Sequence, residues 1–294
     1  MAITKVEDLG DTIPTIIEEA QFIRQFKAVM RGLAWTIRKG KGSTVNVPYM
    51  SEVTSNQLQE GIDMTGSETL VDTNVQITPN EKGLKVILTD SVIEDDNEDL
   101  KRAAGALMGD AYEKKLDQDL FARLDNGTTS LGGSGTTLTM GHVAAARALL
   151  AGNPTSAGGP APTPYACVLH PFVELDIIDV VTPVLPAAGT TQSFGDGPLT
   201  ADILRNYSVG RLFGMPVILD GNTNPDASSN IKQGVFSTGK NGGIIYVPAR
   251  EPTVEPQRDA SLRGWELNYV GRYGVGNWFN GYTVELYTDA SSPS

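Results

Sequence analysis

The stretch that decides the fold is GSTVNVPYMSEVTSNQLQEGIDMTGSETLVDTNVQITPNEKGLKVILTD, residues 42–90. Apolar residues alternate with polar ones at 45–47, 71–77 and 84–88. A period of two indicates β-strands. A long polar, glycine-bearing segment separates the first two strands, which predicts an extended hairpin. A two-stranded hairpin is marginally stable in water, so this one is expected to lie on another surface, a first indication of obligate assembly.

A long helix follows these strands. Residues 97–127, NEDLKRAAGALMGDAYEKKLDQDLFARLDNG, predict a helix of about 45 Å at 1.5 Å per residue. Typical globular helices have about a dozen residues, so this one is predicted to be an architectural spine. Gly127 is expected to close it in a left-handed cap. Gly105 and Gly109 lie four positions apart, which suggests close approach by another backbone.

The rest of the chain divides by its pattern into an arm, a mixed unit and a tail. Near the start, the capping-box pattern Thr15-x-x-Glu18 predicts an amphipathic helix within an N-terminal arm, residues 1–39. Residues 128–248 mix short helices, glycine-rich loops and strands. The aromatic-rich tail, 249–294, reads as strands and turns. The predicted class is therefore α+β.

Charge is distributed unevenly along the chain. The net charge of −12 argues against bulk binding to nucleic acid, which needs basic surface. Residues 24–51 contain six basic residues and no acid, whereas residues 90–99 contain six acids and no base. Both stretches could simply be solvated faces, or they could meet between chains, because complementary charge steers association. The candidate inter-subunit contacts are Arg24, Lys27, Arg31, Arg38, Lys39, Lys41, Glu60, Glu94, Asp95 and Asp96.

The strongest candidate for chemistry is YACVLHP, residues 165–171, which holds the only cysteine, Cys167, and one of two histidines, His170. The segment reads as a strand that ends at Pro171. Side chains three apart on a strand point to opposite faces, so the thiol and the imidazole are not expected to meet. His142 remains a formal alternative partner. The favoured interpretation is a core cysteine and a hydrogen-bonded histidine.

Other motifs fall short of a site. The spacing Gly234-x-x-x-x-Gly239-Lys240 approaches a phosphate-binding loop, but Asn241 stands where Ser or Thr is needed, and a strand pattern follows. The acids near residue 95 lack the glycine and distal glutamate of a calcium loop. One Cys and two isolated His provide no zinc spacing. No catalytic, cofactor-binding or metal site is therefore expected, and neither a secretory signal nor an apolar run of transmembrane length is visible.

The order of these elements resembles the major capsid proteins of tailed bacteriophages, with the Hong Kong ninety-seven capsid fold. The resemblance covers nearly the whole chain, and its specific part is the succession of elements. It implies an N-terminal arm at 1–39, an extended loop at 40–92, a spine helix of the peripheral domain at 93–127, an axial domain at 128–248, and returning strands of the peripheral domain at 249–294. YACVLHP is similar to the first strand of the axial domain.

The resemblance also implies a function and partners. The chain would self-assemble into hexamers and pentamers of an icosahedral shell that encloses double-stranded DNA, with non-specific contact to that DNA. It would be built in the bacterial cytoplasm and would end in the virion. A separate scaffolding protein is expected, because no long scaffolding segment precedes the arm, together with a portal and possible decoration proteins. Neither a membrane partner nor a cofactor is expected.

Three alternatives remain from the sequence. Within the same fold, the chain could form an encapsulin-like cellular compartment. It could instead be an enzyme that uses Cys167 or a phosphate-binding protein that uses Lys240. It could also be a tail or decoration protein, although the long helix beside a long hairpin argues against that.

Overall fold

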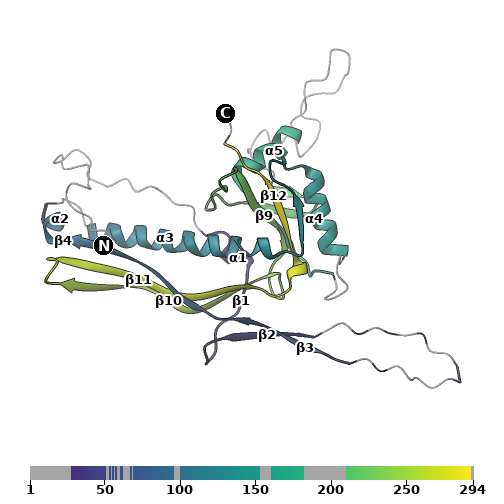
Figure 1. Cartoon of the computed structure of the whole chain (residues 1–294), viewed down its shortest axis with the longest axis horizontal. Coiled ribbons are helices and arrows are strands. Elements are labelled where there is room, and N and C mark those ends of the chain that lie inside the picture. The colour runs from purple at the N-terminus through teal and green to yellow at the C-terminus, as the bar shows by residue number, and fades with distance from the viewer. Residues whose placement is uncertain are drawn as a thin grey trace, which may run out of the picture.

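Two larger β-sheets, a long helix and a projecting hairpin organise the described part of the chain (Figure 1). The computed structural model describes residues 28–50, 53, 55, 57, 60–61, 67, 69–95, 100–152, 160–181 and 210–292; at 95, 100–103 and 179–181 it describes the backbone only. The predicted helix after Thr15 lies outside these residues. The mixture of helices and strands agrees with the predicted α+β class.

The first sheet has four strands in the order β1–β10–β11–β4. Their bounds are β1 Trp35–Thr36, β10 Ile244–Asp259, β11 Gly264–Asn277 and β4 Asn80–Thr89. β1 runs parallel to β10, and the other pairs are antiparallel. Beyond Tyr246, the outer edge of β10 pairs with no strand of the described chain, and it bears register shifts between Pro248 and Thr253. Pro248, Pro252 and Pro256 lie along this strand.

A long helix, α3 (Leu100–Phe121), lies along this sheet, as Figure 1 shows. The short helix α2 (Asp90–Asp95) precedes it, and a 3-10 turn, Leu124–Asn126, follows it. The spine helix is thus confirmed, but it ends earlier than predicted. Gly127 is extended, with φ −56° and ψ 143°, so the predicted left-handed cap is wrong. The glycine is needed for space instead, because a Cβ there would lie 2.7 Å from the Thr283 carbonyl oxygen.

The second sheet has six strands in the order β5–β12–β9–β6–β8–β7. Their bounds are β5 Thr129–Gly132, β12 Thr283–Asp289, β9 Asn230–Ser237, β6 Tyr165–Leu169, β8 Met215–Leu219 and β7 Arg211–Leu212. Two helices join this unit, α4 (Met140–Gly152) and α5 (Pro171–Val181), and a 3-10 turn, Asn280–Tyr282, leads into β12. The strands and helices predicted between 140 and 181 are therefore confirmed.

The hairpin consists of β2 (Val45–Met50) and β3 (Asp72–Ile77), paired in antiparallel register from Val45 opposite Ile77 to Met50 opposite Asp72. It ends before β4, which pairs with β11 along its whole length. The extended loop predicted at 40–92 thus contains both the hairpin and β4, which belongs to the four-stranded sheet. β10 begins at Ile244 and β12 belongs to the six-stranded sheet, so the tail predicted at 249–294 contributes strands to both sheets.

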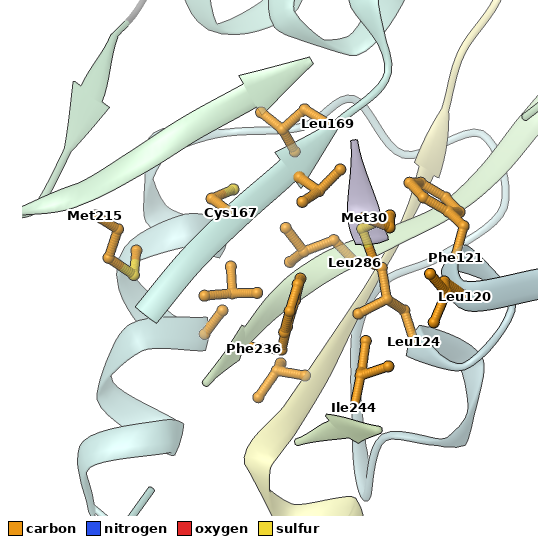
Figure 2. Close-up of a cluster of buried hydrophobic side chains, with 14 of the residues drawn as sticks. Met30, Leu120, Phe121, Leu124, Cys167, Leu169, Met215, Phe236, Ile244 and Leu286 are labelled. Carbon is orange, nitrogen blue, oxygen red and sulfur yellow. The ribbon is translucent and has the colours of Figure 1, made fainter. Parts of the chain in front are cut away.

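The largest apolar core joins the end of α3 to the six-stranded sheet (Figure 2). Leu120, Phe121 and Leu124 pack there with Phe236 and Leu286. The short helix α1 (Met30–Leu33) contacts α3 and contributes its fully buried Met30 to the same core. The two sheets are therefore tied together by one continuous core at the C-terminal end of the long helix.

Candidate functional site

The base of the hairpin is fixed to the four-stranded sheet by a separate apolar cluster. Val47 and Ile77 from the hairpin are buried with Ile245 and Val247 of β10. Each hairpin strand thus turns its inward residues toward the sheet, as the alternation of the sequence predicts. Farther out, the ring of Tyr49 meets that of Phe279 edge-on, with centroids 6.2 Å apart.

The distal part of the hairpin presents large apolar side chains to solvent. Met50 is 71% exposed, Leu70 67%, Val71 52% and Val53 50%. Single exposed apolar residues are common, but four on one projecting element form an unusual concentration. This segment, which we call the apolar tip (Met50, Val53, Leu70 and Val71), is the most prominent candidate contact surface of the described chain.

A buried polar junction connects the start of the described arm to the long helix and to the six-stranded unit. Asp117 of α3 is fully buried. Its Oδ1 accepts hydrogen bonds from the backbone N–H groups of Val29 and Met30, at 3.0 and 2.8 Å. Its Oδ2 accepts from Nδ2 of Asn222, at 2.8 Å. Asp117 thus satisfies free N–H groups at the start of α1 and joins three parts of the chain.

A second buried carboxyl, Asp220, completes this junction. Its Oδ1 accepts from the backbone N–H of Asn222 at 2.8 Å, and its buried Oδ2 has no hydrogen-bond partner in the described part of the chain. Burial first, and then the neighbouring Asp117, raise the pKa of Asp220 to about 7. Two carboxyl groups can hydrogen-bond only if one of them carries a proton. A raised pKa favours the protonated form of Asp220, and a proton on its buried Oδ2 would give that atom a hydrogen bond to donate toward Asp117.

The structure places only part of the predicted basic stretch. Arg24 and Lys27 lie outside the described residues. Arg31 stacks over the Tyr246 ring, 5.7 Å from its centroid, with Nη2 4.0 Å from Glu251 Oε2. The remaining three, Arg38, Lys39 and Lys41, occupy the segment between β1 and β2 and have no ion-pair partner among the described residues; Arg38 and Lys41 are exposed.

The predicted acidic contacts lie elsewhere. Glu94 is exposed in α2, Glu60 is exposed near the hairpin turn, Asp95 is described in its backbone only, and Asp96 is not described. Asp90 instead binds Arg258 within the chain, through oxygen–nitrogen distances of 2.5 and 2.8 Å.

The described parts of the two charged stretches lie far apart in the subunit. Trp35 pairs with Ile245, near the start of β10, whereas Asp90 holds Arg258, near its end. Thirteen residues of strand separate these points, or roughly 40 Å at about 3.3 Å per residue. Among the described residues, the structure therefore does not bring the basic side chains at 31–41 to the acids of α2.

Cys167 of β6 and His170, the residue that follows this strand, are structural. Cys167 is fully buried in the main core (Figure 2), and burial raises the pKa of its thiol to about 12. A thiol held neutral in this way is a poor nucleophile. The buried His170 ring packs edge-on against Phe172, and its Nδ1 accepts the Phe172 backbone N–H at 3.2 Å. Desolvation lowers the pKa of His170, which keeps the ring neutral.

The alternative phosphate loop does not have the required geometry. Gly234 lies inside β9, and the turn around Lys240 leads directly into β10. A phosphate-binding loop must end at the N-terminus of a helix. Among the described residues, no cluster of three or more His, Cys, Asp or Glu could hold a metal, and no helix is long and apolar enough to cross a membrane.

A family model described as "Phage capsid protein" matches residues 72–284, more than half of the chain. The chain belongs to the phage capsid protein family. The matched region runs from β3, the returning strand of the hairpin, through α3 and most of both sheets to the start of β12. The protein is a structural component of a phage capsid. No curated protein sequence matches it.

Solved structures extend the likeness of this capsid protein to the whole fold. One of Mycobacterium phage Che8 is 17% identical, with a TM-score of 0.73 over 94% of this chain and 97% of that one. The capsid of Ralstonia phage GP4 is 12% identical (TM-score 0.66; 100% and 99% covered), and the head structure of Helicobacter pylori bacteriophage KHP40 is 11% identical (0.67; 99% and 100%). The predicted Hong Kong ninety-seven fold is confirmed, and the encapsulin alternative is not favoured.

Sequence reasoning missed the residues that organise this capsid subunit internally. The partners Asp117 and Asn222 are 105 positions apart, and no local pattern links them. Gly105 and Gly109 were expected to admit another backbone. Within the described chain, a Cβ at Gly105 would have no neighbour within 4 Å, and one at Gly109 would meet only the Tyr269 hydroxyl, at 3.7 Å. That expectation is therefore not met inside the subunit.

Proposed function

We propose that this capsid protein assembles with copies of itself into hexamers and pentamers of an icosahedral shell that encloses double-stranded DNA. Membership of the phage capsid family supports a structural role without catalysis. The capsid of Ralstonia phage GP4 and the head of phage KHP40, which have the same fold, support a closed shell. The acidic net charge fits a wall that meets DNA without sequence preference.

The observation that carries the proposal is the contrast within the hairpin. Its base is buried against its own subunit, whereas the apolar tip is exposed. We propose that the tip lies on a neighbouring subunit. Burying a large apolar side chain contributes about 1.5–3 kcal/mol, so Met50 and Leu70 together would stabilise each contact by several kcal/mol.

The test is the double variant Met50→Ser/Leu70→Ser. Both side chains are exposed in the subunit, so its thermal midpoint should stay within about 2 °C of wild type, whereas shells should be lost in negative-stain images. Asn74→Ser, an exposed polar position on the same hairpin, is the matched control and should leave shells intact. Normal shells from the double variant would contradict the proposed role of the tip.

The domain assignment follows from the two sheets. We propose that the four-stranded sheet with α3 forms the peripheral domain and that the six-stranded sheet with α4 and α5 forms the axial domain. The extended loop then spans the hairpin, and the arm, anchored at Asp117, reaches toward a neighbour. We further propose that assembly takes place in the bacterial cytoplasm, with a separate scaffolding protein, a portal and optional decoration proteins. Uniform, closed shells from the chain expressed alone would contradict the scaffolding requirement.

The exposed charges are proposed as a second class of contact. Arg38, Lys39 and Lys41 lie beside the base of the hairpin, and Glu94 lies at the opposite end of the sheet. Since these two groups lie far apart in the subunit, we propose that they meet between subunits, together with Arg24, Lys27, Arg31, Glu60, Asp95 and Asp96 of the predicted set. Their contribution should weaken as salt is added.

A further inference from the structure

Ile77, the last residue of the hairpin, lies directly against two glycines of β11. A Cβ atom at Gly274 would be 2.8 Å from Cγ2 of Ile77, and one at Gly276 would be 2.9 Å from its Cδ1. Real Cβ atoms are essentially never found this close to another heavy atom. The side chain of Ile77 therefore occupies space that exists only because both positions are glycine.

The backbone gives no other reason for these glycines. Neither Gly274 nor Gly276 has a positive φ, so any residue could adopt their conformation. They alternate along one strand and lie opposite Val247 and Ile245, the two β10 members of the cluster that holds the hairpin. A glycine inside a strand often marks such a close approach.

Further contacts hold the chain where it leaves this point. The Arg272 side chain donates from Nε to the Pro79 carbonyl oxygen at 2.9 Å. A Cβ at Gly274 would also lie 3.2 Å from Cα of Pro79. The ring of Trp278 meets that of Trp35 edge-on, 5.6 Å away, beside the same cluster. These contacts fix the base of the hairpin, and β2 and β3 extend from there (Figure 1).

We propose that Gly274 and Gly276 form a seat for Ile77 that sets the direction in which the hairpin leaves its subunit, and that this direction decides whether subunits join into closed shells. The inference rests on the proposed contact between the apolar tip and a neighbouring subunit. It adds the residues that aim this contact, which lie far from the tip itself.

The length of the hairpin makes its direction sensitive to small changes at the seat. Relieving a contact at 2.8–2.9 Å requires a shift of about 0.5 Å at Ile77. Val75 lies two residues from Ile77 in β3, or about 7 Å at 3.3 Å per residue. If Val75 stays in place while Ile77 shifts by about 0.5 Å, the strand tilts by about 4°. The same tilt displaces Leu70 in the apolar tip by about 1 Å. Such a displacement is large for a packed interface.

The test compares Gly276→Ala with Gly264→Ala, a matched control in the same strand. A Cβ at Gly264 would lie 2.6 Å from the Leu88 carbonyl oxygen, so this control is at least as crowded but lies at the far end of β11. Both variants should lower the thermal midpoint by several degrees. Under conditions in which wild type forms shells, Gly276→Ala should reduce closed shells at least tenfold in negative-stain counts, and Gly264→Ala should keep them within twofold.

If Gly276→Ala does not fold, Ile77→Ala provides the test, because it empties the seat without a clash. Folded Ile77→Ala subunits that give open or irregular shells support the proposal, and normal shells overturn it. The Met50→Ser/Leu70→Ser variant distinguishes a failure of the seat proposal from a failure of the proposed tip contact. Normal shells from Gly276→Ala, beside defective shells from the tip variant, overturn the seat alone. Normal shells from the tip variant, beside defective shells from Gly276→Ala, contradict the proposed tip contact alone.

Discussion

The buried pair of Asp117 and Asp220 should make the stability of the subunit fall as the pH rises. Burial and the neighbouring Asp117 raise the pKa of Asp220 from an ordinary 3.8 to about 7. Between these values the folded chain holds a proton that the unfolded chain has released. Its stabilising effect is therefore complete below about pH 4 and is lost as the pH rises through about 7.

The size of the effect follows from the width of the shift. Each pKa unit corresponds to about 1.4 kcal/mol, so the free energy of unfolding should fall by about 2–3 kcal/mol between pH 5 and pH 8 through this group. Asp220→Asn should remove the dependence. Its amide keeps an oxygen for the Asn222 N–H and offers a permanent N–H donor to Asp117, which replaces the shared proton.

Urea unfolding of full-length subunits, followed by tryptophan fluorescence from pH 5 to pH 8, measures this directly. The control is Asp259→Asn, because hydrogen bonds from Ser261 lower the pKa of this exposed carboxyl and it stays ionised throughout the range. Between pH 5 and pH 8, the free energy of unfolding of the control should fall as much as that of wild type, and that of Asp220→Asn should fall less. If the free energies of unfolding of wild type and Asp220→Asn fall equally over this range, Asp220 is already ionised at pH 5. The proposal that Asp220 donates a hydrogen bond to Asp117 is then wrong.

Three further outcomes are expected. Met30→Ala should lower the free energy of unfolding in urea by about 2–5 kcal/mol, because it leaves a cavity in the main core where α1 is attached. A loss below about 1 kcal/mol would show that Met30 does not hold the arm there. Arg38→Glu/Lys41→Glu should abolish assembly, or shift its salt dependence, as measured by light scattering. Adding Glu94→Lys should restore part of the assembly. Assembly that is unchanged by both charge reversals would show that these charges are only solvated. Cys167→Ser should lower the thermal midpoint by several degrees, since the hydroxyl is buried among apolar groups, and should leave shell formation intact below that midpoint.

The order of helices and strands could be predicted because it depends on local periodicity. β2, β3 and β4 follow the alternation of the opening stretch, and α3 follows the long helical run. The pairing partners of these elements could not be predicted. β4 reads as the end of the hairpin until β11 is known to pair with it, and β12 reads as part of the tail until it is seen beside β9. Sheet membership depends on pairing between distant segments, which periodicity does not encode.

The contact surfaces were only partly predictable, for the same reason. The exposed hairpin follows from its length and from its lack of a core of its own. The seat of Ile77 had a usable signal, since alternating glycines in YGVGN suggest a close approach within a strand. Asp117 had none, because an aspartate in a run of charged helical residues looks solvated until Asn222 and the start of α1 are seen around it.

The outer edge of β10 bears on how a shell subunit survives before it is built into a shell. An open strand edge on a free subunit invites fibrous stacking with other copies through backbone hydrogen bonds. Pro248, Pro252 and Pro256 remove donors from this strand, and the irregular register before Thr253 twists it. Promiscuous edge pairing is thereby discouraged, so that free subunits stay available for contacts of defined shape.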